Sequence, residues 1–447
     1  MSADRGLDPA LVPMIEKLEA FEAAAAAAPH KRLTLSLVRQ DGCANRFSMT
    51  VFDGQPEKND EIVERVVKTL LWTAGGHTLY VSGDRALYRR LKAAYAPGGA
   101  RAYDAAFMRR IFDRPFEVRF CAPESLPPEK RCSRRIGGHY AGSRIGFDAG
   151  GSDRKVSAVR DGEVLYSEEV QWLPKVHADP LYHYNEIYAA FRRAAEVLDN
   201  RVDAVGVSSA GICLDNQVKS AALFRAVPKS LYDKHVRHIY TDVAKRFGDM
   251  PVTVENDGDV AALAGYFSGK KGRLLGLAMG TSEAAGYVDA EGGLNGWLNE
   301  LGYVPLCFNR DVRDEISGDY GTGAKYLCQE GVIRLSARVG HVFSPQEDTP
   351  AKKLKSVQNA LERERKRYAP VFETMGLYLG YAVAYYARFY DIGRLLLLGR
   401  VTSGAGGEII LAAAREIVCG RYGLPVEFVM PDEIGRRLSQ SIVAASL

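Results

Sequence analysis

Two periodicities of apolar residues alternate along the 447-residue chain. Apolar positions three and four residues apart predict helices, whereas alternating positions or short apolar runs predict strands. In the first 140 residues, helices are predicted at Pro9–Ala28, Ile62–Thr73, Arg85–Tyr95 and Ala105–Phe112, and strands at Leu33–Val38, Phe47–Phe52 and Thr78–Ser82. This order predicts a small α/β domain over residues 1–140, without a helix-turn-helix.

A basic, proline-bearing linker ends near Arg144, and the pattern then becomes richer in strands. Strands are predicted at Ile145–Phe147, Lys155–Arg160, Glu163–Gln171, Ala204–Ser208, Val252–Val254, Leu274–Met279, Ala284–Val288, Leu395–Leu398 and Val426–Val429. Helices are predicted at Tyr184–Leu198, Val260–Phe267, Lys325–Arg338, Ala351–Tyr390, Gly407–Arg421 and Asp432–Leu447. Two similar α/β lobes are therefore expected, at residues 141–262 and 263–431, with the last helix (432–447) returning to the first lobe.

Each predicted lobe opens with a strand that runs into a glycine turn. In IGFDAGGSDRK (145–155), Asp148 ends the strand, and Gly150 and Gly151 let backbone N–H groups approach an anion. An acid beside such a turn suits a magnesium–phosphate site, because Mg²⁺ prefers oxygen ligands. The segment LGLAMGTSEAAG (275–286) repeats the arrangement. Taken alone, either segment also fits a plain hairpin turn, but the repetition favours two turns that clamp a polyphosphate across a cleft.

Two further motifs place polar residues after buried strands. In VTVENDGDVAALAGYF (252–267), Asp257 follows a strand and is a candidate general base for an attacking hydroxyl. Asn and Asp also favour helix N-caps, so capping by Asp257 or Asp259 is an alternative for this motif. In LLLLGRVTSGAGGEIILAAAREI (395–417), a glycine loop opens a helix, which suits a nucleotide at a helix N-terminus.

Composition narrows the class of protein only slightly. The hydrophobic fraction of 47%, the charged fraction of 26% and the net charge of +4 are ordinary for a globular chain and do not suggest nucleic-acid binding. No apolar run is long enough to span a membrane, and no secretory leader is evident. Seven scattered cysteines without a CxxC pattern predict free thiols in a cytoplasmic protein.

The motifs, in this order, resemble the actin-like ATPase superfamily, which includes the hexokinases and Hsp70, and within it the ROK family of sugar kinases and repressors. The resemblance covers about residues 144–447. It also includes VSSAGICLDNQVKSAALFRAVP (207–228), similar to the family's substrate-side loop, and NELGYVPL (299–306), similar to its Glu-x-Gly-His segment. The implied fold is α/β, with two RNase H-like lobes around a nucleotide cleft, preceded here by the extra N-terminal domain.

The resemblance implies roles for individual positions. Asp257 is the implied catalytic base, and Asp148 lies near Mg²⁺, directly or through water. The implied substrate-binding residues are Asn256, Glu300, Tyr303 and Gly211. The implied ATP-binding residues are Gly150, Gly151, Ser152, Lys155, Gly280, Thr281, Ser282, Gly399, Gly404, Gly406 and Gly407.

The chain departs from the family at a zinc-binding cassette, Gly-His followed by CxCGxxGCxE. The corresponding residues here are Gly302-Tyr303 and EISGDYGTGA (315–324). The four zinc ligands become Tyr303, Glu315, Ser317 and Thr322, which do not form a zinc site, so no zinc is expected. The closing Glu, a sugar ligand in the family, is Ala324. The substrate is therefore less certain than the reaction, and Tyr303 or the N-terminal domain is a candidate source of substitute contacts.

The sequence thus predicts an ATP- and Mg²⁺-dependent phosphoryl transfer to a hydroxyl of a sugar or sugar-like substrate. Two alternatives remain: a non-catalytic sugar sensor or regulator, and an ATPase or activase of the same fold. Expected partners are a small sugar-like molecule and a second copy of the chain, but neither nucleic acid nor a membrane.

Overall fold

The computed structural model describes residues 5–40, 42–430 and 440–447. The chain forms two compact units, and the backbone passes between them after residue 132, within strands β12 and β13, after residue 295 and after residue 429. Unit 1 comprises Met1–Cys132, Leu277–Ala285 and Gly296–Val429, and unit 2 comprises Ser133–Gly276, Gly286–Asn295 and Met430–Leu447. The N-terminal residues therefore share one unit with most of the predicted second lobe. The division at 140 and 262 stays a prediction.

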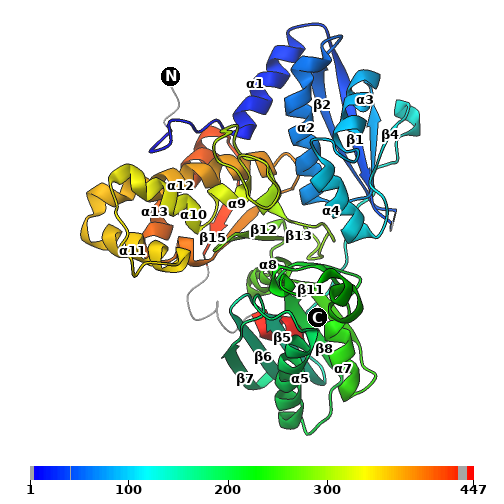
Figure 1. The fold of residues 1–447 in the computed structure, drawn as a ribbon, viewed down its shortest axis with the longest axis vertical. Coiled ribbons are helices and arrows are strands. Elements are labelled where there is room, and N and C mark those ends of the chain that lie inside the picture. Colours follow the sequence, from blue (N-terminus) through cyan, green and yellow to red (C-terminus); the bar gives the residue numbers. More distant parts are fainter. Residues whose placement is uncertain (1–4, 41, 431–439) are drawn as a thin grey trace. The chain divides into compact units, whose positions relative to one another are not determined.

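The N-terminal part of unit 1 is a four-stranded sheet with helices (Figure 1, blue to cyan). Its elements are α1 (Met14–Ala26), β1 (His30–Val38), β2 (Ala44–Phe52), α2 (Pro56–Thr73), β3 (Thr78–Ser82), α3 (Arg85–Ala94), α4 (Ala102–Phe112) and β4 (Glu117–Phe120). The strand order is β2-β1-β3-β4, with β1 antiparallel to both neighbours and β3 parallel to β4. The predicted helices and strands are present. The short edge strand β4 was not predicted, because only Val118 of its four residues is buried.

The prediction of free thiols is wrong for one pair of cysteines. Cys43 and Cys132 form a disulfide with Cα atoms 5.9 Å apart. An isolated bridge between Ala44 and Lys130 brings the two segments together. The pair is 89 residues apart in sequence, so spacing alone could not reveal it. Five other cysteines of the described chain are free: Cys121, Cys213, Cys307, Cys328 and Cys419.

Unit 2 is built on a five-stranded sheet of order β11-β8-β5-β6-β7. Its principal elements are β5 (Ser143–Ala149), β6 (Asp153–Arg160), β7 (Glu163–Gln171), α5 (Pro180–Val197), β8 (Ala204–Ser209), α7 (Ile239–Ala244), β11 (Val252–Asn256) and α8 (Asp257–Gly269). A small hairpin of β9 (Ile212–Leu214) and β10 (Gln217–Ser220) was not predicted. Strands β5 to β7 form an antiparallel meander, whereas β5, β8 and β11 are parallel. The carboxyl ends of these three parallel strands therefore meet at one edge.

The end of the chain packs on this sheet. A Cβ atom on Gly146 of β5 would lie 1.8 Å from the Ser441 carbonyl oxygen, and one on Gly206 of β8 would lie 1.7 Å from that of Ala444. The two glycines thus let the helix at 440–445 approach the strands closely. The start of the predicted helix Asp432–Leu447 lies outside the described residues.

A second four-stranded sheet has the order β13-β12-β14-β15. Its strands are β12 (Leu274–Met279), β13 (Glu283–Val288), β14 (Arg394–Leu398) and β15 (Glu427–Val429), and the helices of unit 1 that follow are α9 (Gly323–Tyr326), α10 (Gln329–Ser336), α11 (Pro350–Arg363), α12 (Arg365–Tyr386) and α13 (Gly404–Arg415). Two predicted helices are each divided in two, because Cys328 has an extended backbone and Glu364, with φ -129° and ψ 56°, also lies outside the helical region. Among the described helices, none is long and apolar enough to cross a membrane.

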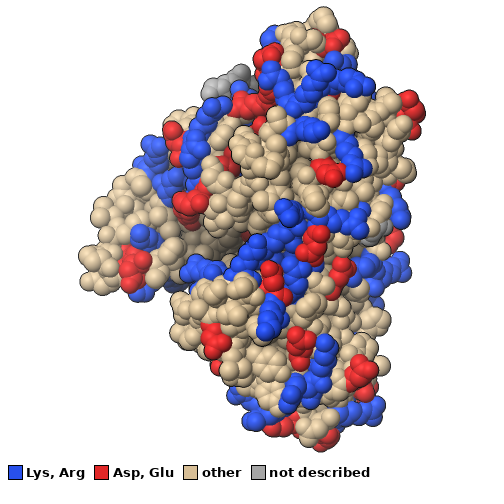
Figure 2. Space-filling model, turned by 45° about the vertical axis from the view of Figure 1, so that its right-hand side comes forward, with Lys and Arg blue, Asp and Glu red and all other residues tan. Residues whose placement is uncertain are grey.

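Charged side chains of both signs are scattered over the face shown in Figure 2. Lys and Arg outnumber Asp and Glu there, but acidic groups lie among them. This mixture agrees with the slight net charge of +4.

Candidate functional site

In unit 2, Asp148 lies near the carboxyl end of the central strand β5. The register places Lys155 of β6 opposite it on one side and Ser208 of β8 on the other. Ser208 Oγ donates a hydrogen bond to Asp148 Oδ1 at 2.8 Å, and Lys155 Nζ lies 3.5 Å from Oδ2. Burial raises the pKa of the Asp148 carboxyl, and the charge of Lys155 and the Ser208 hydrogen bond offset only part of this effect.

Asp257 is the first residue of α8, directly after β11. The residue is half-buried, and its Oδ1 accepts a hydrogen bond from the Gly258 N–H at 3.0 Å. Burial, followed by the negative charge of Asp148, raises the pKa of Asp257 to about 6. The two predicted acids are therefore close enough to act on each other, as expected for groups at the same edge of a parallel sheet.

Asn256 caps helix α8. Its Oδ1 accepts hydrogen bonds from the N–H groups of Gly258 (2.7 Å) and Asp259 (3.3 Å). The residue that caps α8 is therefore Asn256, and not Asp257 or Asp259. The Asn256 Nδ2 donates to the Gly211 carbonyl at 2.8 Å, which joins two of the predicted substrate residues. Gly211 has φ +114° and no room for a side chain, so both residues have structural roles here, and sugar contact by them stays a prediction.

The first glycine turn connects β5 to β6. The Gly150 carbonyl accepts a hydrogen bond from Trp172 Nε1 at 2.9 Å. Ser152 Oγ donates to Asp153 Oδ2 at 3.1 Å, and Lys155 Nζ lies 3.0 Å from Asp153 Oδ1. Asp153 thus organises the predicted phosphate-binding side chains. Sequence reasoning did not assign Asp153 a role, although only Ser152 separates it from the two glycines.

In unit 1, the second glycine turn connects β12 to β13. The Gly280 N–H donates to the Ser282 carbonyl at 3.0 Å, and the Gly280 carbonyl accepts from the Gln329 N–H at 2.9 Å. The residues Thr281 and Ser282 are exposed. Gly399 has φ +95°, and a Cβ there would lie 2.3 Å from the Met279 carbonyl oxygen, so it abuts the end of β12.

The glycines that open α13 differ in their surroundings. A Cβ on Gly406 would lie 2.6 Å from a Phe372 ring carbon, and one on Gly407 would lie 2.0 Å from the Thr402 carbonyl oxygen. Close packing by itself requires glycine at both positions. Gly404 has φ +64° and open space around it. Nucleotide binding by all three stays a prediction.

The segment with Glu300 and Tyr303 is held by α2. The N–H of Asn299 donates to the Thr73 carbonyl, and that of Glu300 donates to the Trp72 carbonyl, both at 3.0 Å. The Tyr303 ring stacks on Trp72 with centroids 4.0 Å apart. Helix α2 therefore contacts the segment that carries two of the predicted substrate residues, Glu300 and Tyr303.

The remaining positions of the zinc cassette serve other contacts. Both Glu315 carboxylate oxygens lie 2.9 Å from Lys325 Nζ, and Ser317 Oγ donates to Asp314. Thr322 is fully buried. Across residues 5–40, 42–430 and 440–447, the structure contains no group of three or more His, Cys, Asp or Glu side chains arranged to hold a metal ion.

Asp319, within segment 315–324, is the centre of a buried ion-pair network that was not predicted. Its Oδ2 lies 2.7 Å from both Lys68 Nζ of α2 and Arg101 Nη1. Arg101 also pairs with Glu64 at 2.7 Å. Single acids and bases this far apart in sequence gave no signal of pairing.

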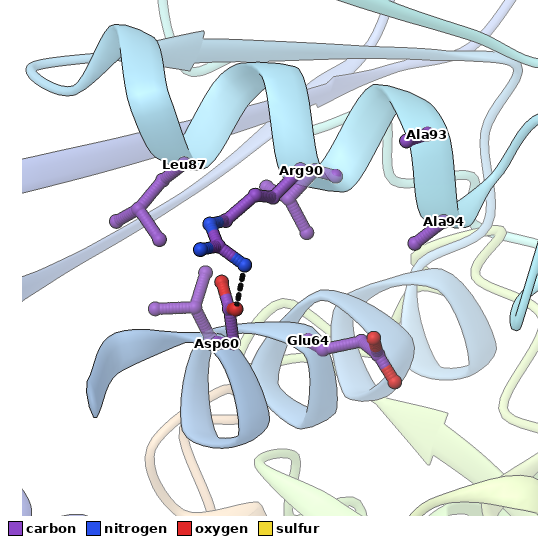
Figure 3. Close-up of a pocket in the computed structure, with 8 residues that line it drawn as sticks. Asp60, Glu64, Leu87, Arg90, Ala93 and Ala94 are labelled. Carbon is purple, nitrogen blue, oxygen red and sulfur yellow. Dashed lines mark hydrogen bonds and ion pairs between the residues drawn. The ribbon is translucent and has the colours of Figure 1, made fainter. Parts of the chain in front are cut away.

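A pocket of about 260 Å³ lies between α2 and α3 (Figure 3). It is lined by Asp60, Val63, Glu64, Leu87, Arg90, Leu91, Ala93 and Ala94. Arg90 pairs with Asp60 at 2.6 Å, and Glu64 pairs with Arg101. Since its charged groups already have partners, we assign no ligand to this pocket.

No family model matches the sequence, and no curated protein matches it either. Solved structures do match. A ROK hexokinase from Thermus thermophilus aligns over 68% of this chain and 97% of its own, with 18% identity and a TM-score of 0.52. A ROK family glucokinase from Streptomyces griseus, solved with glucose and AMPPNP, aligns over 68% and 98%, with 19% identity and a TM-score of 0.52. A ROK family transcriptional regulator, a homolog of the E. coli MLC protein, aligns over 68% and 76%, with 15% identity and a TM-score of 0.54.

These similarities confirm the predicted fold class. The chain has an α/β fold of the actin-like ATPase class. More narrowly, its fold is that of ROK family sugar kinases and ROK regulators. With identities of only 15 to 19%, these structural similarities show the fold and not the activity.

Proposed function

We propose that the chain transfers the terminal phosphoryl group of ATP to a hydroxyl of a sugar or sugar-like substrate. Asp257 is the general base in this proposal. The observation that carries it is the pair of interacting carboxyls, Asp148 and Asp257, at the carboxyl edge of the parallel strands β5 and β11.

The chemistry of Asp257 suits this role. A pKa of about 6 leaves the carboxylate mostly ionised at neutral pH, yet makes it a stronger base than an ordinary aspartate. Asp257 removes the proton of the substrate hydroxyl as the hydroxyl oxygen attacks the γ-phosphorus of ATP, whose bond to the β-phosphate oxygen breaks to release ADP. The N-cap contact of Asn256 fixes the start of α8 and therefore the position of this base.

The groups around Asp148 suit phosphates and a cation. Lys155 is attracted to Asp148 and Asp153, whose negative charges outweigh the effect of burial and raise its pKa, so it stays protonated and can contact a phosphate oxygen. Asp148 can offer a carboxylate oxygen to Mg²⁺, directly or through water. Bound Mg²⁺ neutralises phosphate charge, and the phosphates complete its oxygen ligands. In unit 1, the exposed hydroxyls of Thr281 and Ser282 are proposed as further phosphate contacts.

The test is a kinase assay over a panel of hexoses, N-acetylhexosamines and polyols, with ADP release and sugar phosphate measured together. Asp257→Asn should reduce kcat by roughly 10²–10⁴-fold, the usual contribution of a general base. Glu255→Gln is the matched control, because Glu255 is an acid of the same strand end that pairs with Arg134 at 3.1 Å. Full activity of Asp257→Asn on the best substrate would refute the role of this residue.

A non-catalytic sugar sensor is the second candidate. Its support is the fold similarity to the ROK transcriptional regulator. Thermal stabilisation by a sugar alone, with no shift from Mg-ATP and no ADP release, would favour the sensor over the kinase.

A further inference from the structure

An aromatic cluster joins helices α2 and α4 to segment 299–306, which carries the proposed sugar-binding residues Glu300 and Tyr303. Tyr303 stacks on Trp72 of α2, with centroids 4.0 Å apart and planes at 22°. From α4, the Tyr103 and Phe107 rings lie 6.4 and 6.1 Å from the Tyr303 ring. Tyr103 and Phe107 are four residues apart in one helix, so they share a face.

The base of this cluster is rigid. Trp72 is fully buried, and its Nε1 donates a hydrogen bond to Asp104 Oδ1 at 2.7 Å. The backbone hydrogen bond from Glu300 to Trp72 ties the substrate segment to the same residue. Tyr303 therefore has a fixed orientation that α2 and α4 determine.

The other members of the cluster keep access to solvent. Tyr103, Phe107, Tyr303 and Glu300 are each partly exposed, whereas Trp72 and Asp104 are buried. The Tyr103 and Tyr303 hydroxyls are hydrogen-bonded, and the negative charge of Glu300 acts on both phenols. The exposed part thus combines aromatic rings with one carboxylate and two phenols, a combination that suits a sugar ring, which has polar edges and an apolar face.

Small residues surround Gly302 in segment 299–306. A Cβ on Gly302 would lie 3.6 Å from the Ala324 Cβ and 3.7 Å from the Ser282 Oγ. Gly302 is therefore next to the second glycine turn and next to Ala324, whose methyl group cannot bind a hydroxyl. A sugar bound here must therefore form its polar contacts with other side chains. The aromatic cluster is the neighbouring group, because its member Tyr303 follows Gly302 directly.

We propose that the N-terminal domain completes the sugar site, with Tyr103 and Phe107 joining Tyr303 in an aromatic wall for the apolar face of a pyranose ring. Glu300 binds hydroxyls at the edge of that ring. The inference rests on the proposed sugar kinase function. It also defines the substrate class: a pyranose that is recognised on one face by packing, so that removing or methylating a hydroxyl on this face is tolerated.

The experiment measures KM for the best sugar and for ATP in the full-length protein and four variants. Tyr103→Ala and Phe107→Ala should each raise the sugar KM roughly tenfold, since a stacked aromatic contributes on the order of one factor of ten in affinity. The ATP KM should change less than about twofold. Tyr103→Phe keeps the ring and should retain most of the affinity for the sugar. This variant distinguishes the contribution of ring packing from that of the Tyr103 hydroxyl. Tyr88→Ala is the matched control, because Tyr88 is a partly exposed aromatic of α3 that contacts Phe120 instead.

The results distinguish failure of the aromatic-wall inference from failure of the proposed kinase function. Unchanged sugar KM in Tyr103→Ala and Phe107→Ala, with wild-type turnover intact, would overturn this inference alone. An equal loss in Tyr103→Phe and Tyr103→Ala would also overturn the packing argument. Absence of sugar turnover in the wild-type protein would refute the proposed function, and this inference with it. Thermal denaturation confirms folding, and if an alanine variant is unfolded, the leucine variants Tyr103→Leu and Phe107→Leu take its place with the same expected loss.

Discussion

Replacing Asp319 by Asn tests whether the buried ion-pair network stabilises segment 315–324. The substitution keeps the shape of the side chain but removes the negative charge that faces Lys68 and Arg101, each at 2.7 Å. The Lys68, Arg101 and Asp319 side chains are at most 8% exposed. Two buried cations are then left without their shared counter-ion.

The expected loss can be estimated from the partners that remain. Removing one member of a buried ion pair costs about 3–5 kcal/mol. Arg101 keeps Glu64 at 2.7 Å, and Lys68 keeps Asp104 at 3.7 Å. We therefore expect the lower end of the range, a loss of about 3 kcal/mol in the free energy of unfolding of unit 1.

The assay is urea unfolding followed by tryptophan fluorescence in a Trp172→Phe background, in which Trp72 and Trp297 of unit 1 are the only remaining tryptophans. Asp348→Asn is the control, because Asp348 forms an exposed pair with Lys352 and should leave the midpoint unchanged. A loss smaller than about 1 kcal/mol in Asp319→Asn would show that the ion-pair network does not stabilise segment 315–324.

The pH dependence gives an independent check. Burial by itself would raise the pKa of Asp319, but the charges of Lys68, Arg101 and Arg65 hold it well below its usual range. Because the folded-state pKa is lowered, the stabilisation is present above the unfolded-state pKa of about 4 and is lost as the pH falls below it. The difference between wild type and Asp319→Asn should therefore shrink below about pH 4.

Three further predictions concern single groups. The kcat/KM of the kinase reaction should rise with pH through an apparent pKa near 6, because Asp257 must be ionised, and a flat profile between about pH 5 and 8 would argue against this base. Asn256→Ala should destabilise unit 2 by about 1 kcal/mol through loss of the α8 cap, as measured by urea unfolding in a Trp72→Phe, Trp297→Phe background, and no change would contradict the capping role. Burial raises the pKa of Glu283 to about 8, so the folded protein keeps a proton that the unfolded chain releases above about pH 4.5. Wild-type stability should thus fall as the pH rises toward 8, and Glu283→Gln should remove this dependence; identical pH profiles of the two proteins in thermal denaturation would exclude it.

The local pattern of apolar and polar residues was sufficient to predict most of the helices and strands and the two candidate acids, Asp148 and Asp257. The strand–glycine turns at 148–151 and 279–280 could be predicted because a buried strand, small residues and hydroxyls occur within a few neighbouring positions. Asp257 could be placed at a strand end for the same reason. The breaks at Cys328 and Glu364 were not predicted, since neither residue has a glycine or proline directly beside it to signal the end of a helix.

Long-range pairing could not be predicted. The disulfide between Cys43 and Cys132, the Asp319 network and the contact of Tyr303 with Trp72 all join segments that are distant in sequence. No local preference encodes such partners, because a side chain on α2 contacts residue 303 or 319 only after both segments have packed. The surroundings of the α13 glycines could not be predicted either, because the close contact of Gly406 with Phe372 exists only in the folded chain.

The sequence by itself determined most of the strands and helices, the two glycine turns and the acids that follow strands, because these depend on neighbouring residues. It also showed that the zinc ligands are absent from EISGDYGTGA. The tertiary structure decided what occupies their place: α2 and the start of α4 supply Lys68, Arg101 and Trp72 to the loop and to Tyr303. The physical reason is that ion pairs and ring stacking require atoms within a few ångströms of each other, and only folding brings residues from opposite parts of the chain to that distance.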